Sequence, residues 1–61
     1  MARMTEKQKR FVEEYLIDLN ATQAAIRAGY KVDNARQTAP ENLAKPYISE
    51  AIEKALAERS R

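Results

Sequence analysis

The chain has 61 residues and a net charge of +2, with one glycine and no cysteine, histidine or tryptophan. A chain of this length has room for one small domain. Without Cys or His there is no zinc finger, disulfide framework, thiol nucleophile or Ser-His triad, and one glycine cannot build a P-loop or a dinucleotide fingerprint. No apolar stretch is long enough for a membrane span or a signal peptide. We therefore expect a cytosolic, non-enzymatic binding module that uses no cofactor.

The surplus positive charge is confined to the middle of the chain. Residues 1–21 and 47–61 are each neutral, so the whole excess lies in residues 22–46. The charged side chains of that segment are Arg27, Lys31, Arg36 and Lys45 against Asp33 and Glu41. The pattern fits either an anion-binding patch or an ordinary solvated surface with a chance surplus.

Apolar residues recur with helical spacing almost throughout, and no run alternates apolar and polar, which predicts an all-α, four-helix domain. The first helix is predicted from Glu6 to Leu19, with Thr5 and Gln8 forming a capping box. Its inward stripe comprises Phe11, Val12, Tyr15, Leu16 and Leu19. Oppositely charged i,i+4 pairs, among them Arg10 and Glu14, indicate a solvated outer face.

A short second helix is predicted from Ala21 to Ala28, with Asn20 as its cap and Gly29 ending it in the left-handed conformation. Its small side chains allow a neighbouring helix to approach closely. A third helix is then expected to begin at Asn34 behind an Asp33 cap, after a slightly loose turn.

Two prolines, Pro40 and Pro46, bear on the helix boundaries in the second half of the chain. Pro40 conflicts with a third helix running from Asn34 to Ala44, because an interior proline costs about 3 kcal/mol. Thr38 and Glu41 form another capping pattern, so a helix beginning at Ala39 stays open as the alternative. Pro46 suits the first position of a fourth helix, whose inward residues are Ile48, Ile52 and Leu56.

Two short helices joined by a tight glycine-containing turn describe a helix-turn-helix. On a helical wheel of the third helix, Ala35, Ala39, Asn42 and Leu43 lie on the buried face. Asn34 and Gln37 point outward, where their amides can pair with adenine edges in the major groove.

The remaining candidates for DNA contact surround that helix. Arg36 lies at its flank, where the head of the side chain can reach a phosphate. Lys31 in the turn is placed to contact the DNA backbone, as are the second-helix residues Thr22, Gln23 and Arg27. Thr38 and Lys45, toward the far end, complete the set.

The string Asn20-Ala21-Thr22-Gln23-Ala24-Ala25-Ile26-Arg27-Ala28-Gly29-Tyr30, with supporting matches across residues 5–52, resembles the N-terminal DNA-binding domain of phage terminase small subunits. The resemblance implies that residues 1–61 are one helix-turn-helix domain from a longer chain, binding viral DNA at its packaging initiation site. It also implies a homo-oligomeric ring formed by regions absent here, a large-subunit partner with ATPase and nuclease activity, and a location in the host bacterial cytoplasm.

Two other functions stay open from the sequence. In the first, the amphipathic fourth helix makes the chain a protein-interaction or oligomerisation adaptor. In the second, the chain is a helix-turn-helix transcription regulator, which would share the DNA-binding face but not the specific string.

Overall fold

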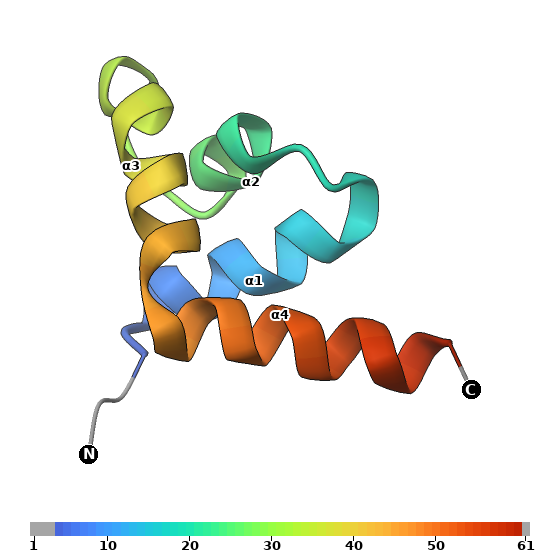
Figure 1. Ribbon diagram of the computed structural model, residues 1–61. Coiled ribbons are helices and arrows are strands. Elements are labelled where there is room, and N and C mark those ends of the chain that lie inside the picture. The colour runs from blue at the N-terminus through green and yellow to red at the C-terminus, as the bar shows by residue number, and fades with distance from the viewer. Residues whose placement is uncertain (1–3, 61) are drawn as a thin grey trace.

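Four α-helices make up the computed structural model, which describes residues 4–60. They are α1 (Glu6–Asp18), α2 (Ala21–Arg27), α3 (Val32–Ala44) and α4 (Pro46–Arg59) (Figure 1). No strand occurs among the described residues, which confirms the all-α prediction. None of these four helices is both long and apolar enough to cross a membrane.

Helix α1 begins as predicted and ends one residue early. The Thr5 hydroxyl accepts from the Gln8 backbone N–H (3.1 Å), and Gln8 Oε1 accepts from the Thr5 N–H (2.9 Å). Leu19 adopts the left-handed conformation, with φ 56° and ψ 29°, because the chain must turn before Asn20 can cap α2. Leu19 is 56% exposed, so its prediction as a core residue is wrong.

Helices α2 and α3 pack through small side chains. Ala24 and Ala25 of α2 are fully buried, as is Ala35 of α3, and Ala39 is 1% exposed. Helix α2 also packs on α1, while α4 packs on α1 and α3 (Figure 1). The predicted close approach of a neighbouring helix to α2 is confirmed.

The turn between α2 and α3 is tighter than predicted. Gly29 takes the expected positive φ, at 105°. Helix α3 then begins at Val32, two residues before the predicted start, with Lys31 at the N-cap position. The carbonyl of Lys31 accepts from the N–H groups of Asn34 and Ala35, which closes the first turn. Asp33 therefore lies inside that turn, where its carboxylate suits the helix dipole, and its prediction as the cap is wrong.

Helix α3 continues unbroken through Pro40. The alternative in which the helix begins at Ala39 is wrong, since Asn34 to Gln37 are helical. Pro40 and Arg36 are both exposed, so the missing hydrogen bond falls on the solvated side of the helix, where water can meet the carbonyl.

The core combines the buried faces of all four helices. Its buried apolar members are Phe11, Val12, Ala24, Ala25, Ala28, Ala35, Ala39, Ile48 and Ile52. Pro46 occupies the first turn of α4 as predicted, and Leu56 packs partly buried against the core. Gln8 is a buried polar residue, and its Nε2 donates to Tyr47 Oη at 3.1 Å.

Candidate nucleic-acid interface

The outer face of α3 carries exposed polar side chains along its first two turns. Asn34, Arg36 and Gln37 are exposed, whereas Ala35 and Asn42 on the other side are fully or almost fully buried. This orientation is the one predicted from the wheel. It leaves two amides and a guanidinium free of the core.

Two further candidates on α3 are placed less favourably. Thr38 is half-buried. Lys45 is half-buried at the junction of α3 and α4, at the opposite end of α3 from Lys31. A 13-residue helix is about 20 Å long, so Lys45 does not join the cluster around the turn.

The α2–α3 turn presents two exposed residues side by side in sequence. Lys31 is exposed and makes no side-chain cap to α3. Val32, which opens the helix, is 66% exposed although it is apolar. Val32 was not predicted to belong to this surface, because the helix was expected to begin two residues later and Val32 to lie in the preceding loop.

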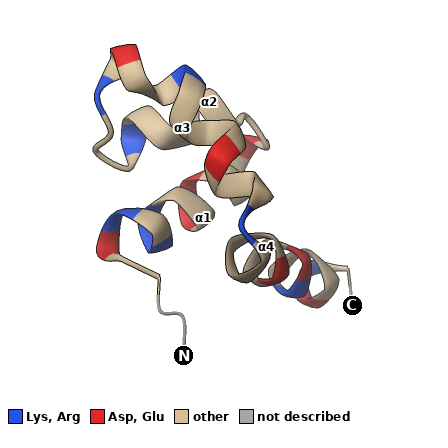
Figure 2. Ribbon diagram, turned by 60° about the vertical axis from the view of Figure 1, so that its left-hand side comes forward, with Lys and Arg blue, Asp and Glu red and all other residues tan. Residues whose placement is uncertain are grey.

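A basic residue from α1 joins the turn. Lys7 Nζ lies 5.5 Å from the centroid of the Tyr30 ring, within the range of a cation–π contact. At exposed sites such contacts contribute about 0.5–1 kcal/mol. Figure 2 shows basic segments near the start of α1 and around the α2–α3 turn on the same side of the molecule.

Lys7 was not among the residues predicted to bind DNA, and one sequence signal could have identified it. The residues three and four positions away in the sequence are Arg3, Met4, Arg10 and Phe11, none of them acidic. A lysine without an i,i+4 carboxylate partner is free to serve another purpose.

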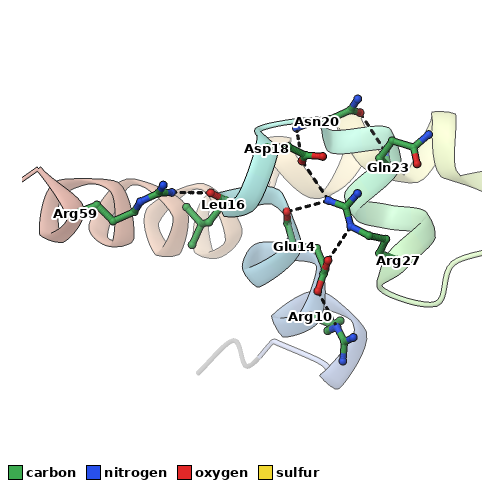
Figure 3. Close-up of polar contacts among 8 residues, drawn as sticks. All are labelled: Arg10, Glu14, Leu16, Asp18, Asn20, Gln23, Arg27 and Arg59. Carbon is green, nitrogen blue, oxygen red and sulfur yellow. Dashed lines mark hydrogen bonds and ion pairs between the residues drawn. The ribbon is translucent and has the colours of Figure 1, made fainter.

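Arg27 forms an ion-pair network that joins α2 to α1 (Figure 3). Its Nε donates to Glu14 Oε1 at 2.7 Å, and its Nη2 donates to Asp18 Oδ1 and to the Glu14 carbonyl, each at 3.1 Å. Arg10, the predicted partner of Glu14, binds the other oxygen of that carboxylate at 3.2 Å. We call Glu14, Asp18 and Arg27 the α1–α2 clamp.

The clamp lowers the pKa of Asp18 and raises that of Arg27. The hydrogen bond from Arg27 and the backbone N–H of Asn20 hold the pKa of the Asp18 carboxyl below its ordinary value of 3.8. Hydrogen bonds to Asp18 and Glu14 raise the pKa of Arg27, which stays charged. Three donor sites of Arg27 are thereby engaged within the protein.

Folding redistributes the charge that was assigned to residues 22–46. Arg27 is neutralised by acids from outside that segment, Glu14 and Asp18. Lys7, also from outside it, lies beside the turn. Among the described residues, the exposed positive charge near the turn is therefore carried by Lys7 together with Lys31 and Arg36, which are two of the four basic residues in the predicted segment.

The other α2 candidates lie at its first turn. Thr22 is half-buried and Gln23 is exposed, and the Gln23 backbone N–H donates to the capping side chain of Asn20 at 3.1 Å. No group of three or more metal-ligating side chains that could hold an ion is found within residues 4–60.

Comparisons with known proteins converge on one family. A family model described as "Terminase small subunit" matches residues 4–61. The chain is 49% identical over 57 residues to the terminase small subunit of Bacillus phage SF6, and the match covers 92% of this chain and 39% of that protein. The corresponding protein of Bacillus phage SPP1 is 49% identical over 55 residues, covering 88% of this chain and 37% of its own length.

A more distant relative comes from another host. The terminase small subunit of Staphylococcus phage 80alpha is 43% identical over 54 residues, which cover 87% of this chain and 37% of that protein. The chain therefore spans roughly two fifths of the length of these curated relatives.

Proposed function

Since the chain belongs to the terminase small subunit family, we propose that residues 1–61 form a non-catalytic helix-turn-helix domain that binds double-stranded DNA. Its role is to recognise the packaging initiation site of viral DNA and present that site to the large-subunit motor. The proposal includes self-assembly through regions outside this chain, action in the host bacterial cytoplasm, and no cofactor.

One observation carries the proposal. Helix α3 is packed on α2 through Ala24, Ala25 and Ala35, so its first two turns project Asn34, Arg36 and Gln37 outward. A helix presented in this way, beyond a tight turn from a short supporting helix, has the geometry of a recognition helix in the major groove.

The residue types on that surface suit both parts of DNA recognition. Asn34 and Gln37 can each pair with the N6 and N7 atoms of adenine. The exposed Val32 side chain offers the apolar contact that a thymine methyl group takes. Lys31 and Arg36 supply the cations that meet phosphates and fix the register of the helix.

Helix α2 supports this surface rather than reading bases. Thr22 and Gln23 at its N-terminal end are positioned for backbone contact. Arg27, with its guanidinium engaged by Glu14 and Asp18, acts in this proposal by holding α2 on α1. Thr38 and Lys45 are the outer limit of the interface.

The small charge implies that one copy binds weakly. A net charge of +2 favours few phosphate contacts, and non-specific constants for DNA-binding proteins are typically about 10⁻⁴–10⁻⁶ M. Several copies held in one ring raise the apparent affinity through effective concentration.

Mapping the interface by backbone amide NMR tests the proposal. On titration of the 61-residue chain with a short duplex, we expect the largest shift changes from Lys31 to Thr38. Changes confined to Ile48 to Leu56 would contradict DNA recognition by α3 and favour the interaction adaptor. The packaging role is tested with a multimeric full-length protein and two duplexes, one with the packaging initiation sequence and one without it. Equal affinity for the two duplexes would contradict the packaging role.

A further inference from the structure

We propose that Lys7 of α1 contacts the phosphate backbone of bound DNA, held beside the α2–α3 turn by the ring of Tyr30. This inference rests on the proposed DNA-binding function. It extends the interface beyond the two helices of the motif to the first turn of α1.

Two distances place the side chain of Lys7 beside the turn. Its Nζ lies 5.5 Å from the Tyr30 ring centroid. Its Cε lies 3.7 Å from the point where a Cβ on Gly29 would stand, so the aliphatic stem runs along the turn itself. The chain leads directly from Tyr30 to Lys31, the exposed residue at the start of α3.

Tyr30 is itself held in place. It is half-buried and packs against the core, and its hydroxyl lies 3.5 Å from Asn42 Nδ2 of α3. The ring therefore stands between α1 and α3. A lysine resting on it is directed to the side of the molecule that carries Lys31.

Lys7 is available to a ligand. Within residues 4–60 it forms no ion pair with a carboxylate, whereas Arg10 is paired to Glu14 and Arg27 to Glu14 and Asp18. It is exposed, and it lines a shallow depression between the start of α1 and Ala28.

Lys7 occupies a helix position that is unfavourable for a cation, and it shares the first turn of α1 with Glu6. A cation in the first turn of a helix lies at the positive end of the dipole, where it is disfavoured. A DNA phosphate at this place pairs with the lysine and also interacts favourably with the positive end of the helix dipole. Lysine, a strongly hydrated point charge on a flexible stem, suits a phosphate better than a base edge.

The salt dependence of duplex binding tests this assignment. For B-DNA, each phosphate contact contributes about −0.9 to the slope of log K against log salt concentration. We expect Lys7→Gln to make the slope less steep by about one unit and to weaken binding equally on unrelated duplexes. Lys54→Gln in α4 makes the same change of charge and should leave the slope unaltered.

Two more variants separate the contact from a structural effect. Lys7→Arg keeps the charge and should retain the wild-type slope. Tyr30→Leu removes the ring but keeps Lys7, so it should weaken binding less than Lys7→Gln does. Melting curves by circular dichroism establish that each variant is folded under the conditions of the titration.

The outcomes distinguish the inference from the function on which it rests. In one outcome the wild-type chain binds duplex, Lys31→Ala makes the salt-dependence slope less steep and Lys7→Gln leaves that slope unchanged. The inference is then wrong and the proposed function stands. If the wild-type chain binds no duplex, both are wrong. A reduction of the slope in Lys7→Gln equal to that in Lys54→Gln would also overturn the inference, because it would reflect net charge alone.

Discussion

Arg27 Nε lies 2.7 Å from Glu14 Oε1, so the one basic side chain of α2 is turned toward α1. The side chain of Arg27 is 35% exposed and that of Glu14 is 16% exposed, which makes this pair the less solvated part of the α1–α2 clamp. If Arg27 positions α2 and Lys31 binds phosphate, loss of Arg27 should affect mainly stability and loss of Lys31 should affect mainly DNA affinity.

Arg27→Ala is expected to lower the melting temperature, because it removes the ion pairs with Glu14 and Asp18 that join α2 to α1 and leaves Glu14 paired with Arg10 of its own helix. Lys31→Ala removes an exposed side chain that caps nothing, so it should weaken DNA binding with little change in melting temperature. Calorimetry and a duplex titration on both variants make the comparison. Equal melting temperatures for Arg27→Ala and the wild type would show that the clamp does not hold the helices together.

Acid should weaken the clamp through Asp18. Because folding lowers the pKa of this carboxyl, its contribution to stability is fully present above its ordinary value of 3.8 and is lost as the pH falls through the folded value. Asp18→Asn removes that contribution at every pH. The difference in melting temperature between wild type and variant should be largest near neutral pH and shrink below pH 3.8; a difference independent of pH would refute the role of the ionised carboxylate.

Within α3, variants of the base-reading residues and of the phosphate-binding residue are expected to have different effects on DNA binding. Replacing Gln37 or Asn34 by Ala should change the preference between duplex sequences by about 1–3 kcal/mol for each adenine that is no longer paired with an amide. Arg36→Ala should weaken binding to all sequences alike. Competition titrations against a panel of duplexes measure both effects, and a uniform weakening for Gln37→Ala and Asn34→Ala would place these amides away from the bases.

Val32 offers a test that needs no knowledge of the natural site. A duplex with uracil in place of thymine lacks the C5 methyl groups but keeps the same hydrogen-bonding edges. We expect the wild-type chain to bind the thymine duplex more tightly than its uracil counterpart, and Val32→Ala to narrow that difference. The exposed position of Val32 makes disturbance of the core small. An undiminished preference in Val32→Ala would assign the methyl contact elsewhere.

Local signals predicted most of the helix boundaries. The Thr5 and Gln8 capping box, the Asn20 cap and the left-handed Gly29 each depend on residues within four positions, and all three are confirmed. Pro46 at the start of α4 is confirmed for the same reason.

Tertiary packing outweighed local preference at two places. Helix α3 runs through Pro40, as the longer of the two predicted helices did, because burial of Ala35, Ala39 and Asn42 favours one continuous helix. Leu19 lies outside the core because the chain needs a left-handed residue before α2.

The residues around the candidate interface illustrate the same limit. The exposed face of α3 followed from periodicity, so Asn34 and Gln37 were correctly expected to face outward. The partners of Arg27 lie 9 and 13 residues away, and Lys7 is 23 residues from Tyr30 in sequence. Contacts over such separations depend on how the helices cross, which no spacing rule gives.

Titration of the 61-residue chain with duplex DNA at two or more salt concentrations tests the central claim most directly. We predict measurable binding at low salt that weakens steeply as salt is added. Because Lys7, Lys31 and Arg36 each contact a phosphate in this account, each should contribute about −0.9 to the slope of log K against log salt concentration. Absence of binding at about millimolar duplex in low salt, far above typical non-specific constants, or binding that does not change with salt, would contradict DNA recognition by this domain.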